Sequence, residues 1–282
     1  MIKIDKPEID LSIILDNCIS SMRENRKSRI INSKEIILQE SKKYNSLAKE
    51  GELYTIEEHD SVNGVATKDD MEALYTQKFV PEGQANRKYY DMIKLLAPYS
   101  KCPYCGQNLV KTVDHFLPKA KYVTFSVTPD NLVPSCTDCN ELKGATTFEC
   151  YEKQPYHPYY DDISSINWLK ARMIEKEVIA FEFYAEPPLE WGEQEKNRLI
   201  NYFENLHLND IYKVHAAELY DSKEERFKML YIKGGKTLAI KRLNEEVEDA
   251  SRKRNNTWKA AMYQAIIDND WYWNVYMPQC AK

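Results

Sequence analysis

Two pairs of cysteines in the middle of the chain have the spacing of a metal site. Cys102 and Cys105 form one Cys-x-x-Cys pair, and Cys136 and Cys139 form a second pair, with 30 residues between them. Each pair lets two thiolates approach one ion from a tight turn, and two pairs complete a tetrahedral shell of four sulfurs. Such a closed shell leaves no position for water. The spacing therefore predicts one structural zinc ion per chain rather than a redox dithiol.

The segment that contains these pairs also carries a second kind of ligand. Asp114, Asn131 and Asn140 offer side-chain oxygens, which suit magnesium or manganese. His115 offers a ring nitrogen that can take a proton near neutral pH. The residues therefore predict an open site for a divalent ion beside a base.

A structural alternative exists for the same four residues. Asp114 and His115 could form a hydrogen-bonded pair in a turn, and Asn131 and Asn140 could cap loops. Any one of these residues alone would favour that alternative. All four together, between or beside the two cysteine pairs, favour a catalytic site. The other histidines have no comparable companions and are expected at the surface or in the core: His59, His157, His207 and His215.

The order of these residues resembles the HNH, or ββα-metal, endonuclease family. The pattern is Asp-His, then Asn, then Cys-x-x-Cys-Asn-x-x-Lys, with a Cys-x-x-Cys pair ahead of it. In this motif the last His is often Asn, and the chain is similar to such His-Asn-Asn variants. The longer strings CPYCG, DHFLPK and NLVPSC, followed by HPYYDD, are similar to the HNH subunits of bacterial anti-phage defence systems of the Septu and retron-associated kind.

The resemblance implies a role for each matching residue. His115 matches the general base, which deprotonates the attacking water. Asp114 and Asn140 match the positions that bind the catalytic ion, and Asn131 matches the residue that holds the loop and orients the base. Successive side chains of a strand point to opposite faces, so a bulge or the strand end must re-aim either Asp114 or His115 toward the ion.

Two lysines and a glycine complete the comparison with the family. Lys119 and Lys143 lie close enough in sequence to contact a substrate phosphate. Gly144 stands where some family members place a further metal-binding His. The ion would then have two protein ligands, with water and phosphate in the remaining positions. The resemblance thus implies an exchangeable Mg²⁺ or Mn²⁺ ion rather than tightly held zinc or nickel.

The composition bounds the class of protein. The 282 residues are 43% hydrophobic and 29% charged, which is ordinary for a folded protein with a core. The net charge of −5 argues against a simple DNA-coating protein. The chain has no run of about 18 apolar residues, so we expect no membrane helix. The first residues lack the pattern of a signal peptide. Seven cysteines without an export signal favour metal binding over disulfides, so we expect a cytoplasmic protein.

The segments that must position the candidate residues are expected to be mostly helical. Apolar residues at three- and four-residue spacing predict a helix over residues 11–22. Thr67 and Asp70 have the form of a capping box at the start of another helix. Residues 113–118 are expected to form a strand that ends at a proline, and Asn140 is expected at the start of a short helix.

The residues after the second cysteine pair are expected to be helical, with one strand. Residues 178–184 are rich in β-branched and aromatic types, which predicts a strand. Three or four helices are expected from Trp191 onward, and Gly234 and Gly235 separate two of them.

These elements predict an α+β, mostly helical fold with a small zinc-stapled ββα-metal core between helical flanks. We expect a helical N-terminal region at 1–97 that could dock a partner. The nuclease core is expected at 98–150 and a mostly helical C-terminal region at 151–282.

The leading hypothesis from the sequence is a metal-dependent HNH endonuclease that hydrolyses phosphodiester bonds of nucleic acid, with DNA favoured. The resemblance implies the effector nuclease of an anti-phage defence system that acts with an ATPase partner. The alternative is a zinc-stapled nucleic-acid or protein adaptor without chemistry, which would bind without metal-dependent cleavage. Under the first hypothesis, activity should fall below the pKa of His115, nominally about 6.5.

Overall fold

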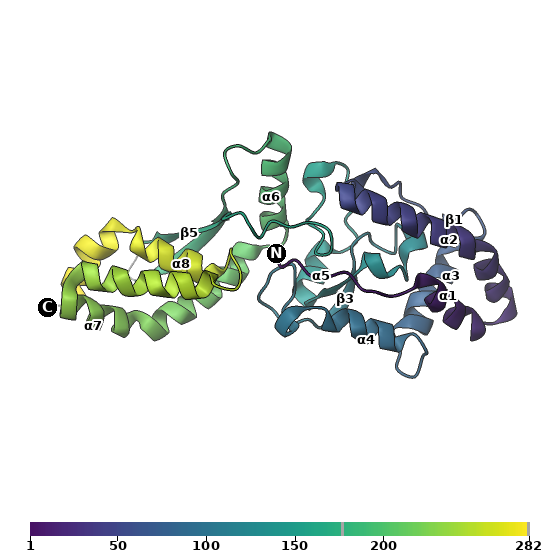
Figure 1. The fold of residues 1–282 in the computed structure, drawn as a ribbon, viewed down its shortest axis with the longest axis horizontal. Coiled ribbons are helices and arrows are strands. Elements are labelled where there is room, and N and C mark those ends of the chain that lie inside the picture. The colour runs from purple at the N-terminus through teal and green to yellow at the C-terminus, as the bar shows by residue number, and fades with distance from the viewer. Residues whose placement is uncertain (176–177, 281–282) are drawn as a thin grey trace. The chain divides into compact units, whose positions relative to one another are not determined.

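The computed structural model describes residues 1–175 and 178–280. The chain divides into two compact units, Met1–Asp162 and Ile163–Lys282. As predicted, the fold is α+β and mostly helical, and its strands form small two-stranded sheets (Figure 1). The helical residues 1–97 and the expected nuclease core at 98–150 lie together in the first unit. None of the helices in the described part of the chain has the length and apolar character needed to cross a membrane.

The first unit consists of helices around two short antiparallel sheets. Its helices are α1 Leu11–Ser20, α2 Glu24–Glu50, α3 Lys68–Ala73, the π-helix η2 Leu74–Phe79, α4 Arg87–Leu95 and α5 Thr137–Lys143. Its strand pairs are β1 Ser61–Val62 with β2 Ala66–Thr67, and β3 Thr112–His115 with β4 Leu132–Ser135. Short 3-10 turns lie between them: η1 Leu53–Thr55, η3 Pro98–Ser100, η4 Val123–Phe125, η5 Pro129–Asn131 and η6 Tyr151–Lys153.

Polar side chains start two of the N-terminal helices. At α1, Asp10 accepts a hydrogen bond from the backbone N–H of Ser12 at 2.8 Å. At α3, Thr67 and Asp70 form the predicted capping box, in which each side chain accepts from the other residue's backbone N–H. Both caps satisfy N–H groups that have no partner within the helix. Asp70 also accepts bonds of 2.6 and 2.7 Å from Arg29, which ties α3 to α2.

One apolar core joins the N-terminal helices to the β3–β4 sheet. Buried side chains from α1, α2, η2 and the two strands belong to the same cluster, among them Ile14, Ile37, Phe79, Val113 and Leu132. Full burial of one such side chain contributes about 1.5–3 kcal/mol. The helical N-terminal region is therefore part of the body that supports the β3–β4 sheet.

β3 is shorter than expected and has a regular pairing with β4. It ends at His115 rather than at Pro118. Asp114 lies opposite Val133 and His115 opposite Leu132, without a bulge between them. His115 is therefore the residue at the strand end, where the chain leaves the sheet.

α5 begins earlier than expected. Its first residue is Thr137, because Cys136 acts as the N-cap and its sulfur accepts from the backbone N–H of Cys139 at 3.4 Å. Asn140 therefore lies inside the helix. Gly144 follows the last turn with a φ of 51°, a conformation that glycine adopts with little strain.

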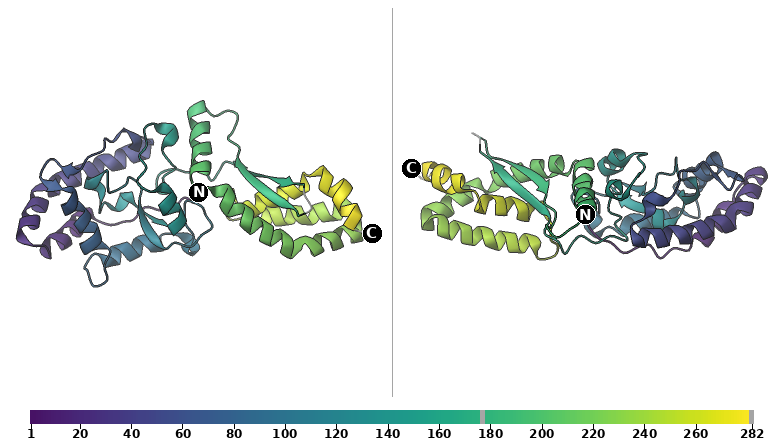
Figure 2. Two further views of the ribbon diagram at one scale, coloured as in Figure 1. Left: turned by 180° about the vertical axis from the view of Figure 1, so that it is seen from behind. Right: turned by 90° about the horizontal axis from the view of Figure 1, so that it is seen from above.

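The second unit packs a strand pair against helices. The predicted strand is present as β6 Ala180–Ala185, and it pairs with β5 Leu169–Ile174, which the sequence did not reveal. The helices are α6 Glu193–Asn205, α7 Leu208–Ser251, α8 Trp258–Ile267, the π-helix η7 Tyr272–Tyr276 and α9 Met277–Cys280. α7 contacts β6 and α8 contacts β5, and the two helices lie against each other (Figure 2).

A pair of glycines breaks α7 into two arms, as the sequence predicts. Gly234 has a φ of −155° and Gly235 a φ of 65°, so neither is helical. Arg226 and Glu246, on opposite sides of the break, form an ion pair of 3.5 Å. Residues 20 positions apart on one straight helix would lie about 30 Å apart. The two arms therefore fold back on each other.

Candidate active site and zinc centre

The four predicted zinc ligands lie together in the interior of the first unit. The sulfurs of Cys102, Cys105, Cys136 and Cys139 are all within 4.8 Å of one another, and all four residues are buried. Four sulfurs bound about 2.3 Å from a tetrahedral zinc ion stand about 3.8 Å apart. The cluster therefore has the composition and the size of a structural zinc site.

Backbone and side-chain donors around the sulfurs prepare them for an ion. The backbone N–H of Asn108 donates to Cys105 and that of Cys139 to Cys136, both at 3.4 Å. Hydrogen bonds from the other three thiols lower the pKa of Cys105, because a thiolate there accepts them, and the same contacts raise the pKa values of Cys136 and Cys139. Asn108 also donates to Asp138 at 2.7 Å, which links the two knuckles directly.

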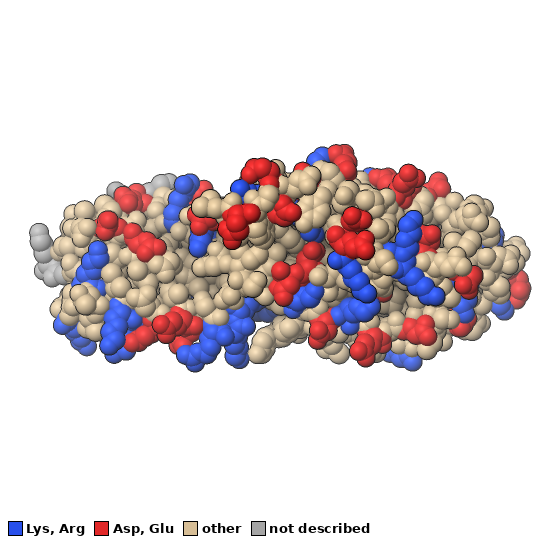
Figure 3. All heavy atoms as spheres, turned by 45° about the horizontal axis from the view of Figure 1, so that its top comes forward, with Lys and Arg blue, Asp and Glu red and all other residues tan. Residues whose placement is uncertain are grey.

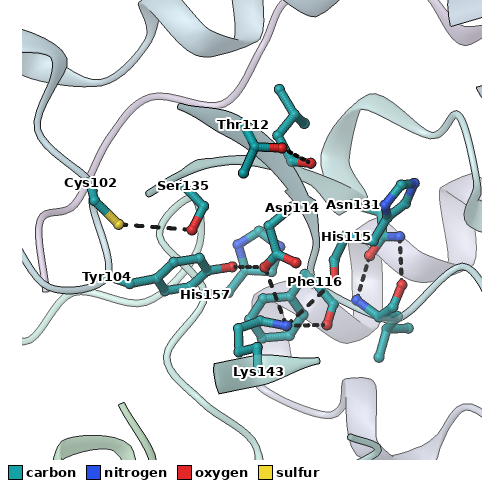
Figure 4. A network of polar contacts seen from close by, with 12 residues as sticks. Cys102, Tyr104, Thr112, Asp114, His115, Phe116, Asn131, Ser135, Lys143 and His157 are labelled. Carbon is teal, nitrogen blue, oxygen red and sulfur yellow. Dashed lines mark hydrogen bonds and ion pairs between the residues drawn. The ribbon is translucent and has the colours of Figure 1, made fainter. Parts of the chain in front are cut away.

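Asp114 is a buried carboxylate that is held by two donors. It is 4% exposed, and the hydroxyl of Tyr104 donates to its Oδ2 at 3.0 Å. The ammonium of Lys143 lies 3.3 Å from the same oxygen. Figure 4 shows both side chains pointing at Asp114. Burial raises the pKa of Asp114, while Lys143 and Tyr104 oppose the rise. The cation at this carboxylate is the ammonium of Lys143, at the position that the sequence assigns to a metal ligand.

Lys143 is enclosed rather than directed to solvent. Its side chain is 6% exposed. The Nζ atom is 3.4 Å from the carbonyl oxygen of His115 and 3.2 Å from that of Phe116. It also lies over the rings of Phe116 and Phe148. A phosphate contact by Lys143, as expected from the sequence, would require its ammonium to leave Asp114.

The two remaining candidates, Asn140 and Lys119, are partly exposed. Asn140 precedes Lys143 by three residues on α5, and such residues share one face of a helix. The face of α5 that bears Asn140 is therefore the face that reaches Asp114. Lys119 lies in the loop after β3, close enough to the imidazole for its charge to lower the pKa of His115.

His115 is buried and has a defined tautomer. It is 8% exposed, its Nε2 lies 2.9 Å from the carbonyl oxygen of Ser126, and Tyr75 packs edge-on against its ring at 4.4 Å. A carbonyl only accepts, so Nε2 carries the hydrogen and Nδ1 has a free lone pair. Burial lowers the pKa of His115 to about 3, and the charges of Lys119 and Lys143 add to this effect. The nominal value of 6.5 therefore does not apply to this arrangement.

Asn131 clamps the loop between β3 and β4. It is fully buried, and its Oδ1 accepts from the backbone N–H of Leu117 at 2.7 Å. Its Nδ2 donates to the carbonyls of Leu117 at 3.0 Å and Phe125 at 3.3 Å. The clamped loop includes Ser126, whose carbonyl holds the imidazole of His115. The amide thus fixes the segment that orients the candidate base.

Several residues near this site were not assigned from the sequence. Tyr104 and Tyr75 contact Asp114 and His115, and Tyr104 lies inside the first cysteine pair, which is a usable signal. His157 is in the core, as expected, but it has a companion: its ring bonds to the hydroxyl of Tyr44. Tyr44 lies on α2 with no local sequence signal beyond helical spacing.

Comparison with known proteins agrees with this geometry. The HNH endonuclease family model matches residues 102–146, which contain both cysteine pairs and the Asp-His dipeptide. Septu protein PtuB of Bacillus thuringiensis is 38% identical over 80 residues, which cover 26% of this chain and 31% of that protein. No solved structure matches. Protein ea31 of Escherichia phage lambda is 32% identical over 292 residues, which cover 96% of this chain and 98% of that protein. The chain therefore belongs to the family of the lambda ea31 protein and carries an HNH endonuclease domain at residues 102–146.

Proposed function

We propose that this protein is a metal-dependent endonuclease that hydrolyses phosphodiester bonds of nucleic acid, with DNA as the favoured substrate. One observation supports it above the others. Asp114 and His115 are adjacent and buried at the end of β3, within the matched HNH domain. Asp114 pairs with the ammonium of Lys143, and His115 is a neutral imidazole whose Nδ1 has a free lone pair. Hydrolysis of a phosphodiester uses these two kinds of group.

In this proposal His115 is the general base. Its Nδ1 accepts a proton from the attacking water, while Nε2–H stays bonded to the Ser126 carbonyl. That carbonyl keeps the ring oriented and stabilises the imidazolium that forms. Asn131 acts indirectly, by clamping the loop that carries Ser126. The four cysteines would hold a structural zinc ion, which would fix α5 against the strands and would take no part in the reaction.

Asp114 and Asn140 would hold the Mg²⁺ or Mn²⁺ ion, which supplies positive charge to the phosphate and the leaving oxygen. The Lys143 ammonium lies on Asp114. We infer that this ammonium would contact the substrate phosphate once it no longer pairs with Asp114. Lys119, a partly exposed residue in the loop after β3, would contact the phosphate backbone.

We further propose that the protein is the effector of a bacterial anti-phage defence system and acts in the cytoplasm with an ATPase partner. The similarity to a Septu protein supports the defence role. Acidic and basic side chains are interspersed on the face drawn in Figure 3, and the net charge is −5. Such a surface binds nucleic acid weakly, so a partner that delivers or selects the substrate fits it better.

The test is cleavage of plasmid and of single-stranded DNA with Mg²⁺ or Mn²⁺, by the full chain alone and with the product of the neighbouring gene. His115→Ala should lose cleavage by about 10²–10⁴-fold, the usual contribution of a general base. It should keep zinc and fold. His215→Ala, in the second unit, is the matched control and should cleave as the wild type does.

Retained nicking by a clean His115→Ala preparation would overturn the assignment. The adaptor alternative makes different predictions for the same samples. It expects DNA binding without metal-dependent cleavage, and equal tolerance of Asp114→Ala and His115→Ala.

A further inference from the structure

A buried histidine outside the proposed chemistry occupies a defined place in the first unit. His157 is 1% exposed, and its ring lies 4.1 Å from that of Phe116 and 4.8 Å from that of Tyr160. Phe116 is the residue that follows His115. A polar ring buried this close to the site must satisfy its nitrogens within the protein.

The hydrogen bonds from His157 through Tyr44 to Asn131 all have the same donor-to-acceptor direction. The backbone N–H of Tyr159 donates to Nδ1 at 3.2 Å, so this nitrogen carries no hydrogen. Nε2 is then the protonated nitrogen, and it donates to the hydroxyl oxygen of Tyr44 at 3.2 Å. Tyr44 directs its own hydrogen to Oδ1 of Asn131 at 3.1 Å. Each group therefore has its donor or acceptor role set by the group before it.

The last member of this chain is the amide that clamps the loop. Oδ1 of Asn131 accepts from Tyr44 and from the N–H of Leu117, so both donors favour the same orientation of the amide. Rotating the amide by half a turn would place its NH₂ group against two donors. In the observed orientation, Nδ2 donates to Phe125, whose neighbour Ser126 holds the imidazole of His115.

We propose that Tyr44 and His157 are positioning residues for His115, acting through Asn131 and the loop that carries Ser126. This inference rests on the proposed nuclease function. It assigns a role to α2, which supplies Tyr44, and to the segment after the HNH domain, which supplies His157. The geometry of the base is then set by three segments that are distant in the sequence.

The first experiment removes one hydroxyl from the chain of bonds. Tyr44→Phe should lower kcat of DNA cleavage about tenfold with KM unchanged, since the buried hydrogen bonds to Asn131 and His157 are lost without any change in contact to substrate. Tyr160→Phe is the matched control. Its hydroxyl also joins α2 to this loop, through Asn45 at 2.7 Å and Asp130 at 2.9 Å, but makes no bond to Asn131. It should change kcat less than twofold.

A second pair of variants separates positioning from packing. His157→Gln places an amide N–H near the position of Nε2 and should restore most of the kcat that His157→Leu loses. Equal kcat values for the two His157 variants, or an equal loss of kcat in Tyr44→Phe and Tyr160→Phe, would overturn the proposal.

Hydrogen exchange distinguishes this proposal from the nuclease assignment. The amide of Leu117 donates to Asn131, so Tyr44→Phe should speed its exchange about tenfold and Tyr160→Phe should not. If the wild type cleaves no nucleic acid with metal and partner present, the proposed function fails, and faster exchange at Leu117 still supports the link from Tyr44 to the loop. Unchanged exchange in Tyr44→Phe would overturn that link whatever the activity.

Discussion

The ammonium of Lys143 lies 3.3 Å from Oδ2 of Asp114, the carboxylate that the proposed ion would bind. Lys143→Met keeps most of the buried stem and removes the charge. We expect the variant to bind Mn²⁺ on the order of tenfold tighter, because no cation then competes for Asp114. A Mn²⁺ titration followed by electron paramagnetic resonance, without DNA, measures this directly.

Lys119→Met is the control for the Lys143 variant. It also removes one positive charge, but from a partly exposed residue in the loop after β3. Its Mn²⁺ affinity should stay near that of the wild type. Equal affinities for all three proteins would show that the ammonium of Lys143 does not compete with the ion.

The depressed pKa of His115 has a consequence for stability. Its pKa is about 3 in the folded chain, against about 6.5 in an unfolded chain. Between these values the unfolded state binds the extra proton, so the free energy of unfolding falls as pH decreases through this window. The slope is at most about 1.4 kcal/mol per pH unit. Urea unfolding at pH 7.5 and 5.0 should show this loss, and His115→Gln should show a smaller one.

The same pKa changes the expected rate profile. The sequence alone predicts that activity falls below pH 6.5. The ratio kcat/KM reports the free enzyme, in which the pKa of His115 is much lower and the imidazole stays neutral to lower pH. A substrate phosphate beside the ring would favour the imidazolium and raise its pKa. As pH is lowered, kcat should therefore begin to fall at a higher pH than kcat/KM does.

Candidate residues that are marked by local spacing could be predicted from the sequence. Residues that are marked only by distant contacts could not. The cysteine pairs and the Asp-His dipeptide stand in one short segment. By contrast, Tyr44 lies 87 residues before Asn131, and nothing near it in the sequence marks its bond to that amide. The pairing of Lys143 with Asp114 spans 29 residues and depends on the docking of α5.

Among the elements, α5 is joined directly to the cysteine cluster, because Cys136 is its N-cap and Cys139 lies in its first turn. It has seven residues, which is too short for a stable isolated helix. Removing zinc with a chelator should therefore increase hydrogen exchange in residues 137–143 while the core amides of α2 stay protected. Cys136→Ser should behave like the chelated protein. Cys150→Ser, outside the cluster, should keep its zinc and its protection.

The helices were easier to predict than the strands. The first helix and the capping box of α3 follow from local patterns and are present in the structure. β5 was missed because its charged sequence is not typical of a buried strand. Its stability comes from β6, against which Arg172 forms a cross-strand ion pair with Glu182 at 2.6 Å. A single-sequence pattern does not reveal such a partner.

For the whole molecule, the boundary between the two units falls after Asp162 rather than at residue 150. A fragment of residues 1–162 contains the complete apolar core and all four cysteines. It should unfold cooperatively and hold one zinc ion. A fragment of residues 1–150 lacks His157, and also Tyr159, whose hydroxyl donates to Leu132 at 2.6 Å. It should melt at a lower temperature.

Thermal melts followed by far-ultraviolet circular dichroism, with zinc analysis of both fragments, check this prediction. Equal melting temperatures would show that residues 151–162 add nothing to the first unit. The sequence predicted the α+β class and the place of the HNH domain, but it could not predict this division. The division depends on which segments share a core, and distant contacts decide that.

The location of His157 also bears on how the protein is made. Ribosomes deliver the chain from the N-terminus, so the HNH motif is complete before His157 and Tyr159 have been added. Until then the hydroxyl of Tyr44, which bonds to the amide of Asn131, lacks the hydrogen bond that His157 supplies. A nascent chain therefore carries the motif of a nuclease without its final alignment. Under the proposed function, only chains whose synthesis has passed that point would hold His115 in its final alignment.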